Sequence, residues 1–429
     1  MTPGIEFAAF IGIDWEHEAH AVCVLPAAGG VAQQGRVKQT PEAIAAWAAE
    51  LREQFGGRPV AVCLEQSRGA LVYALMQYEF LVLHPLNPKQ LADYRAALYP
   101  SGAKCDPTDA ELLARFLRDH TDKLRAWRPD DAITRGLRLL TEQRRKWVQD
   151  RVAATNELQQ RLKESYLLAF ELCGLNLASE SSLALLEKFP SQRELQRASP
   201  KQLERWLPKR RRVADDPPAA ELLRARIAVI HAALPLTTDE PVLEHARLVV
   251  GHLVVQLRAL NRAIRDCDQK IAELFATHPD GELFASFPGA GQALAPRLAA
   301  AYGTDRDKFP AAEDMQQLSG IAPVTKASGK SQIVQMRWAC PKFLRQTFHE
   351  FAGSSIKYSR WAKAYFDMRK ARGHRYHEIL RGLAFKWQRI LFHCWKTHQP
   401  YHEDHYLQRL RDTGSPIIQF LPPDPIPLA

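Results

Sequence analysis

A change of hydrophobic pattern near residue 125 divides this chain into two kinds of structure. Before it, short apolar runs of strand length alternate with helix-length segments, which predicts an α/β domain. After it, the segments 132–168 and 242–275 carry apolar residues at broken helical spacing among many charges. Two such long helices can pair as an antiparallel coiled coil. The expected fold class is therefore α/β plus all-α, with a long helical middle.

The first part of the chain has the pattern of a sheet covered by helices. Residues 7–13, 20–25 and 30–38 predict an antiparallel meander of strands. The uninterrupted apolar run 59–65 is typical of a buried parallel strand. The other predicted elements are helices from Pro41, from Ala70 and over 109–120, and a strand over 80–86.

These patterns predict four segments. The first is a catalytic α/β domain over residues 1–125, followed by a helical coiled-coil region over 126–279. A Leu-rich, helical stretch near 168–235 is inserted in that region. A mostly helical domain is expected over 280–412, and a proline-rich, flexible tail over 413–429. Within residues 280–412, two apolar stretches are separated by Pro288-Gly289-Ala290-Gly291. This pattern predicts either a helix-hairpin-helix that binds phosphate or a plain turn.

Positive charge is concentrated near the C-terminal end. The whole chain carries 58 Lys and Arg against 48 Asp and Glu. Between residues 321 and 400, sixteen residues are basic and three are acidic. A basic surface with aromatic side chains suits phosphate backbones and stacked bases, so we predict a nucleic-acid surface here; the alternative is a solvated helical surface over core aromatics. The interleaved aromatic residues are Trp338, Phe343, Tyr358, Trp361, Tyr365, Phe366, Tyr376 and Trp387.

Several classes of protein are disfavoured. The seven cysteines are scattered and include no Cys-x-x-Cys, which argues against a disulfide framework or a zinc site. No apolar run is long enough to span a bilayer, and no signal peptide is visible. We therefore expect a cytoplasmic protein with no membrane partner.

Four acidic residues are candidates for a metal site. Asp14 ends the apolar run that contains Ile11 to Ile13, and Glu65 ends the run that begins at Val60. Ligands in α/β domains bind at strand ends. Asp106 and Asp109 are three residues apart at a helix start and therefore share one helix face. Four oxygen donors suit Mg²⁺, and two such ions can assist displacement at a phosphodiester.

Each acidic residue also has an ordinary explanation. An aspartate that ends a strand is commonly a turn residue, and Asp109 could be a helix N-cap. The run that ends at Asp14 is also similar to the opening of sugar kinases and actin-like ATPases, which usually continue with glycine and a hydroxyl residue. Here Trp15 and Glu16 follow instead. Together with the basic C-terminal region, the four acidic residues favour nuclease-like chemistry.

The motifs then show a specific resemblance. They are Ile11-Gly12-Ile13-Asp14, the strand that ends at Glu65, Lys104-x-Asp106-x-x-Asp109-Ala110, Phe287-Pro288-Gly289-x-Gly291, and Leu318-Ser319-Gly320-Ile321-x-Pro323 before Ser328-Gly329. In this order the chain resembles the DEDD-type insertion-sequence transposases, a family of bridge-RNA-guided recombinases related to the Piv-type DNA invertases. The motifs lie in both end domains.

The resemblance implies more than the residues alone. It implies a Holliday-junction-resolvase-like, RNase H-like N-terminal domain in which Asp14, Glu65, Asp106 and Asp109 bind metal. It also implies that Ser328 is a nucleophile that forms a covalent phosphoserine with DNA. A structured bridge RNA encoded by the element would pair with target and donor DNA. From the residues alone, Ser328 is a serine before glycine, between Lys326 and Lys330, where cations could stabilise charge at phosphorus.

Other functions stay open at this point. A protein-only DNA invertase or a metal-dependent junction nuclease would use the same acidic residues, and a non-catalytic RNA- or DNA-binding derivative would not need them. Ser319 and Ser331 are alternative nucleophiles. We also expect a homo-oligomer, dimer or tetramer, because a long helical spacer separates the acidic residues from Ser328.

Overall fold

The computed structural model of the 429-residue chain describes residues 5–65, 68–98, 106–174, 176–206, 217–329 and 331–422, with no side-chain description for 106, 171, 217–220 and 222. The chain forms two compact units, residues 1–129 and residues 130–429. Each unit is described by itself. In the described part of the chain, no helix is long and apolar enough to cross a membrane.

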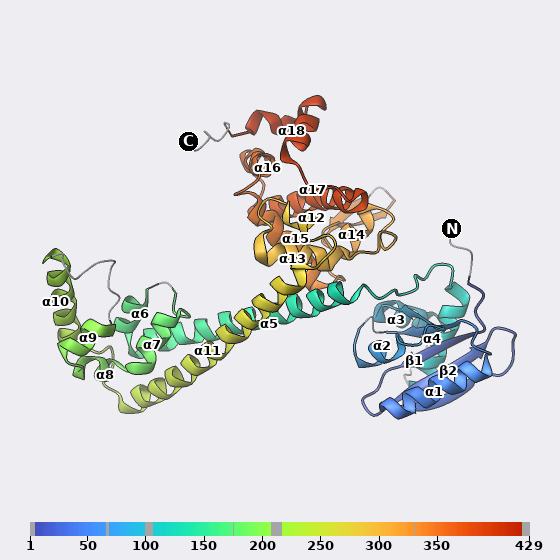
Figure 1. Cartoon of the computed structure of the whole chain (residues 1–429), viewed down its shortest axis with the longest axis horizontal. Helices are drawn as coiled ribbons and strands as arrows, with labels where there is room; N and C mark the ends of the chain where they lie inside the picture. The colour runs from blue at the N-terminus through green and yellow to red at the C-terminus, as the bar shows by residue number, and fades with distance from the viewer. Residues whose placement is uncertain are drawn as a thin grey trace. The chain divides into compact units, whose positions relative to one another are not determined.

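A five-stranded mixed sheet forms the centre of the first unit (Figure 1). Its order is β3-β2-β1-β4-β5, with β2 antiparallel to both β1 and β3, and with β4 parallel to both β1 and β5. The predicted meander and the predicted buried parallel strand are therefore confirmed. The strands are β1 (Ala9–Asp14), β2 (Ala19–Pro26), β3 (Gln33–Lys38), β4 (Val60–Leu64) and β5 (Leu81–Pro85).

Helices cover both faces of this sheet, because alternate residues of a strand point to opposite faces. Ile11, Ile13 and Leu64 pack with helices α1 (Pro41–Gln54) and α2 (Ala70–Leu75). On the other face, Ala61 and Cys63 pack with α3 (Pro88–Leu98) and α4 (Asp106–His120). The first unit is thus a three-layer α/β/α domain. The C-terminal ends of the parallel strands β1, β4 and β5 lie at one edge of its sheet.

Two long helices form the stem of the second unit (Figure 1). Helix α5 (Ala132–Ser165) and helix α11 (Glu240–Ala276) run antiparallel, as the predicted pairing required. Arg144 contacts Asp268, and farther along α5 the Arg151 guanidinium donates to Asn261 Oδ1 at 3.4 Å. We call this pair the stalk.

Short helices cap the far end of the stalk, in the stretch near 168–235 that the sequence predicted to be helical. Their leucines pack on Leu158, Leu162 and Leu257 of the stalk, all fully buried. We call this part the distal cap. Its helices are α6 (Leu167–Cys173), α7 (Glu180–Lys188), α8 (Gln192–Arg197), α9 (Pro200–Trp206) and α10 (Pro217–Ala232).

The rest of the second unit is mostly helical, as predicted, and packs around an aromatic core. A two-stranded hairpin interrupts the helices. The elements are α12 (Gly281–Ala285), α13 (Gly291–Tyr302), α14 (Ala312–Leu318), β6 (Val324–Ser328), β7 (Ser331–Gln335), α15 (Lys342–Ser355), α16 (Arg360–Ala371), α17 (Tyr376–Thr397), α18 (Glu403–Asp412) and the 3₁₀ helix η1 (Pro416–Phe420).

The structure corrects two expectations for this region. The flexible tail predicted over 413–429 is wrong for residues 413–422, because η1 packs against α16 and Ile417 is buried. Residues 423–429 lie outside the described part of the chain. The expected basic surface with interleaved aromatics is corrected in part: Trp361 and Trp387 are fully buried in the aromatic core, as the alternative of core aromatics expects.

Candidate catalytic site

Two of the predicted acidic residues lie at the same edge of the sheet. Asp14 is the last residue of β1, and Glu65 directly follows β4. The strands are parallel neighbours in which Ile13 pairs with Leu64, so each acidic residue is one position beyond that pair. Neighbouring strands lie about 4.8 Å apart. Both side chains are half-buried, and the alternation of the strands places them on the face that α4 covers.

Helix α4 packs unusually close to β1 at this edge. A Cβ atom at Gly12 would lie 2.0 Å from the carbonyl oxygen of Ala110 and 2.5 Å from the amide nitrogen of Ala114. Gly12 therefore lets the first turns of α4 lie directly on the strand. Asp109, the neighbour of Ala110, is almost fully buried by this contact. The Ile-Gly-Ile-Asp motif thus has a packing role as well as a chemical one.

Asp109 has an ion-pair partner that the sequence analysis missed. Arg95 of α3 lies with its Nη2 2.6 Å and its Nε 2.9 Å from Asp109 Oδ1. Both side chains are largely shielded from water, with Arg95 17% and Asp109 3% exposed. An arginine in the last turn of the preceding helix was the only sequence signal for this pair. The guanidinium satisfies a carboxylate that would otherwise be a costly buried charge.

The remaining predicted ligand falls at the limit of what the structure describes. Asp106 opens α4, and its side chain is outside the description, as are Lys104 and Cys105 of the same motif. Among the side chains that are described, no three His, Cys, Asp or Glu form a cluster that could hold a metal ion. The predicted four-carboxylate site therefore stays a prediction. The carboxylate oxygens of Asp14 and Glu65 at one sheet edge are ligands that suit a hard cation such as Mg²⁺.

Burial also affects the neighbouring thiol on β4. The Cys63 side chain is fully buried, and this burial, together with the charge of Glu65, raises its pKa to about 12. Cys63 therefore stays a neutral thiol at physiological pH. It is a core residue beside the acidic edge.

Ser328 lies at the tip of an exposed β-hairpin. It is the last residue of β6 and pairs with Ser331, the first residue of β7, across a turn that includes Gly329 at a φ of +55°. All five residues of β7 are exposed, as are Ser328 and Gly329. Lys330 is outside the described residues.

The two alternative serines have different environments. Ser319 is fully buried, donates to the carbonyl oxygen of Gln316 at 3.3 Å and accepts from Gln388 Nε2 at 2.7 Å. A hydroxyl held in this way cannot meet a phosphodiester without local unfolding. Ser331 is exposed opposite Ser328 and keeps its place as an alternative nucleophile.

The basic C-terminal region contains both paired and surface charges. Lys363 forms an ion pair with Asp367 of the same helix. Arg369 Nη2 lies 3.7 Å from Glu378 Oε1. These pairs show that part of the positive charge is used within the domain. Three aromatic side chains remain largely exposed: Trp338, Tyr358 and Tyr376.

The predicted glycine turn joins two helices but is closed on one side. It lies between α12 and α13, with φ of +81° at Gly289 and +51° at Gly291. A Cβ atom at Gly289 would lie 3.0 Å from the backbone of Ser354, whose hydroxyl donates to the Gly289 carbonyl oxygen at 2.8 Å. At Gly289 the turn therefore packs against α15, which favours the plain-turn alternative for that residue.

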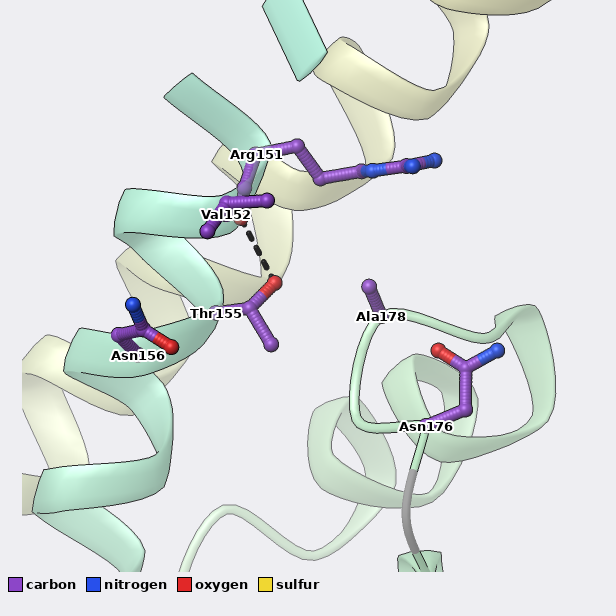
Figure 2. A pocket seen from close by; sticks show the side chains of 6 residues that line it. All are labelled: Arg151, Val152, Thr155, Asn156, Asn176 and Ala178. Carbon is purple, nitrogen blue, oxygen red and sulfur yellow. Dashed lines mark hydrogen bonds between the residues drawn. The ribbon is translucent and has the colours of Figure 1, made fainter. Parts of the chain in front are cut away.

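A cavity of about 330 Å³ lies beside the stalk (Figure 2). Arg151, Val152, Thr155 and Asn156 of α5 line one side of it. The other side is the loop before α7, with Asn176 and Ala178. None of these lining residues is acidic, so the cavity is no candidate for the metal site.

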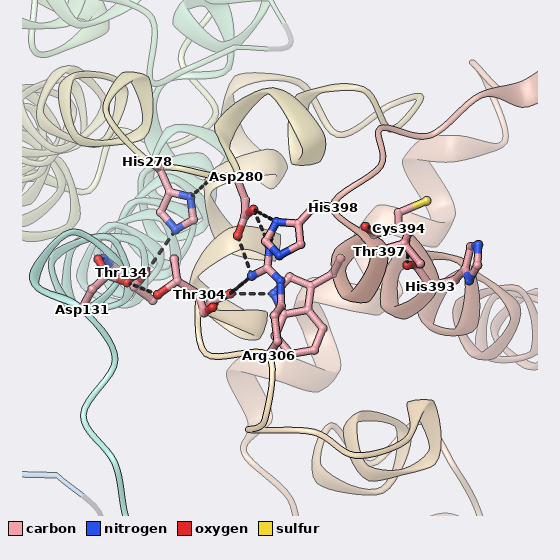
Figure 3. Close-up of polar contacts among 12 residues, drawn as sticks. Asp131, Thr134, His278, Asp280, Thr304, Arg306, His393, Cys394, Thr397 and His398 are labelled. Carbon is pink, nitrogen blue, oxygen red and sulfur yellow. Dashed lines mark hydrogen bonds and ion pairs between the residues drawn. The ribbon is translucent and has the colours of Figure 1, made fainter.

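A polar network joins the base of the stalk to the C-terminal helices (Figure 3). Asp131 caps α5. A hydrogen bond of 3.1 Å joins the Thr134 hydroxyl of that helix to His278 Nε2. Asp280 forms a two-pronged ion pair with Arg306, whose guanidinium also lies over the Trp395 ring. We call these residues the basal network. It is largely buried and fixes where the stalk begins.

Comparison with known proteins links both end regions to one group. Residues 11–167 match a family described as "Transposase", and residues 281–367 match one described as "Transposase IS116/IS110/IS902 family". The chain is 28% identical to the mini-circle protein of IS117 from Streptomyces coelicolor, over 92% of this chain and 95% of that protein.

Two further relatives come from other insertion elements. An uncharacterized 42 kDa protein of IS900 from Mycobacterium paratuberculosis is 29% identical over 73% of this chain and 77% of its own length. An uncharacterized 43.6 kDa protein of IS110 from Streptomyces coelicolor is 26% identical over 90% of this chain and 94% of its own. The similarity therefore runs across both units.

Proposed function

Because both end regions match transposase models, we propose that the chain is a transposase of the IS116/IS110/IS902 family and exchanges DNA strands through a covalent phosphoserine at Ser328. The observation that carries this proposal is the position of Ser328 at the tip of an exposed hairpin. The hairpin and its flanks hold basic residues and no acidic residue, from Met315 through His349. No carboxylate of this segment would repel a phosphodiester that approaches the tip.

The proposed step is an in-line displacement at phosphorus. Ser328 Oγ forms a bond to phosphorus, a deoxyribose oxygen leaves, and the serine proton passes to a base. A serine hydroxyl needs such a base, or a cation, to become a nucleophile. Because the phosphoserine ester conserves the energy of the broken bond, a second deoxyribose hydroxyl can attack it and release the serine unchanged. The cycle consumes no nucleoside triphosphate.

The acidic edge of the first unit is the proposed Mg²⁺ site. Asp14, Glu65, Asp106 and Asp109 would hold the ions, in the RNase H-like arrangement that the family resemblance implies. When bound, Mg²⁺ would neutralise charge on the phosphate oxygens. The chain's own part is to hold the carboxylates in place: Gly12 admits α4, and Arg95 orients Asp109. Metal binding at Asp109 would compete with this ion pair.

We further propose an element-encoded bridge RNA as the guide and a homo-oligomer as the active form. The surplus of basic residues between 321 and 400 supports nucleic-acid partners. The oligomer would bring the carboxylates of one chain to Ser328 of another. Mixed oligomers of an Asp14→Asn chain and a Ser328→Ala chain would then regain part of the activity that each lacks.

The test of the proposed function is adduct formation on a nicked DNA substrate, supplied with the RNA encoded beside the gene. After protease digestion, mass spectrometry of the native protein should find a nucleotide remnant on the peptide that carries Ser328. The Ser328→Ala variant should form no adduct, and Asp14→Asn or excess EDTA should also abolish it. Ser331→Ala is the matched control, because this exposed serine lies directly opposite and should keep the adduct.

Three results would move the assignment. A remnant on Ser331 would transfer the nucleophile to the neighbouring strand. DNA cleavage without any adduct, still present in Ser328→Ala, would indicate a metal-dependent nuclease that uses water. An adduct at Ser328 without any dependence on RNA would favour a protein-only invertase.

A further inference from the structure

The segment around the hairpin has an unusual charge pattern. From Met315 through His349 the chain contains no Asp or Glu. Its basic residues are Lys326, Lys330, Arg337, Lys342 and Arg345. The described residues of the hairpin are mostly exposed, including the apolar Ile333 and Val334 at 53% and 61%. An exposed apolar surface in an acid-free segment fits a polyanionic partner better than another protein surface of mixed charge.

Trp338 is the most distinctive side chain in this segment. It is 74% exposed, whereas the other tryptophans of the described C-terminal helices, Trp361, Trp387 and Trp395, are fully buried. Tryptophan is the side chain that gains most from being covered. A domain that buries three indoles and leaves the fourth in water therefore presents that fourth ring to a partner.

The turn that carries Trp338 is held in place despite its exposure. The Arg337 carbonyl oxygen accepts from Arg345 Nη1 at 3.3 Å, and the Cys340 thiol lies 3.8 Å from the same oxygen. Gly320, at a φ of +70°, lets Cys340 approach, because a Cβ atom there would lie 2.3 Å from the sulfur. This close approach explains why a glycine stands at position 320. The turn is therefore preorganised.

Arg345 also covers one face of the indole. Its guanidinium carbon lies 5.9 Å from the centre of the Trp338 ring. A cation over one face of an aromatic ring is a favourable contact that holds the ring. With one face against Arg345 and three-quarters of the side chain exposed, the indole has room for a second flat group.

We propose that Trp338 and Arg345 form a stacking platform for an unpaired base of the DNA strand under exchange. This inference rests on the proposed function, because strand exchange must unpair the bases next to the broken phosphodiester. Base stacking on an aromatic ring is sequence-tolerant, and a nearby cation adds to it. Trp338 follows β7, whose last residue, Gln335, pairs with Val324, four residues from Ser328 along β6. At about 3.3 Å per residue, Gln335 lies about 13 Å from the hairpin tip, and Trp338 follows it by three residues.

The test uses the Ser328→Ala protein, so that binding is measured without chemistry. The probe is a DNA duplex with a short single-stranded overhang that carries 2-aminopurine, whose fluorescence is quenched by stacking. Quenching should be strongest at one position a few nucleotides from the junction with the duplex. Adding Trp338→Ala should remove this quenching and weaken binding of the overhang substrate by about tenfold.

The matched variants separate stacking from folding. Trp338→Phe keeps a flat ring and should retain part of the quenching. Tyr73→Ala, at an exposed aromatic residue of helix α2, should leave quenching and affinity unchanged. A blunt duplex without unpaired bases should bind Trp338→Ala as well as it binds the parent.

Two outcomes would overturn the platform. The first is full quenching in Trp338→Ala. The second is an equal loss of affinity on overhang and blunt duplexes, which would make Trp338 a duplex contact. Neither outcome depends on Ser328, because that residue is replaced throughout. A missing adduct in the earlier experiment would instead reject the proposed function and leave the stacking result intact.

Discussion

Gly12 shows how a single missing methyl group places a candidate metal ligand. Any side chain there would meet the backbone of α4, with the nearest atom, Ala110 O, at 2.0 Å. Gly12→Ala should push α4 from the sheet, destabilise the first unit by about 1–3 kcal/mol and move Asp109. Hydrogen exchange of the full-length protein should speed up at the β1 and α4 amides.

Gly35→Ala is the matched control for this prediction. Gly35 lies in β3 of the same sheet, and a Cβ atom there would meet Val22 Cγ2 at 3.5 Å, an ordinary contact. Exchange in β1 and α4 should stay at the native rate in this variant. Native exchange rates in Gly12→Ala would contradict the view that α4 is seated by the glycine.

At the scale of elements, the stalk and the distal cap depend on each other. Leu162 of α5 is fully buried among leucines of the cap. Leu162→Ala should lower the free energy of unfolding of the cap by about 2–5 kcal/mol, through lost contacts and a cavity. Leu139 is on the same helix but 55% exposed, so Leu139→Ala should change stability by no more than about 0.5 kcal/mol. Urea unfolding followed by hydrogen exchange checks both; equal effects would contradict this packing.

Most of the elements of the fold could be predicted from the sequence. Periodicity located the strands, the stalk helices and the helical cap region, because each buries one continuous apolar stripe or run. It could not separate surface aromatics from core aromatics, since Trp338 and Trp387 both stand among basic residues. Residues 413–422 of the predicted tail were mispredicted because proline content indicates local disorder, whereas Ile417 finds a tertiary contact.

The candidate site was predictable only in part. Strand ends pointed to Asp14 and Glu65, because the last residue of a buried run is recognisable in sequence. The Arg95–Asp109 pair comes from tertiary packing of two helices, and its one sequence signal, an arginine in the last turn of a helix, is too common to predict it. Ser328 came from family resemblance, since a Ser-Gly pair in a basic stretch is common in proteins without such chemistry.

At the scale of the molecule, the basal network should make the second unit sensitive to acid. Burial lowers the pKa of the His278 imidazole below its ordinary value, outweighing Asp280 and Asp131, which raise it; Arg306 lowers it further. The unfolded chain therefore binds more protons than the folded chain just below pH 6.5. Stability should fall as the pH drops through about 6.5 and level off below the folded-state pKa.

The variant His278→Gln tests this dependence. The thermal midpoint should fall less between pH 7.5 and 5.5 in His278→Gln than in the native protein, because the buried titrating group is gone. His393→Gln, at an exposed position of α17, should keep the native slope. An unchanged slope in His278→Gln would assign the acid sensitivity to other histidines.

The distal cap has a consequence for how such proteins diversify. The stalk helices contain 34 and 37 residues, so each is about 50–55 Å long, and the cap occupies the end where the chain turns back. The two family matches cover residues 11–167 and 281–367, so α7 to α10 of the cap lie in neither, and α11 of the stalk lies in neither as well. We expect the cap to be exchangeable as a module, because it packs at the end of the stalk where the chain turns back. A chimera with a different cap keeps the hairpin, the basal network and the acidic edge, while presenting a new surface to whatever nucleic acid or protein the distal end meets.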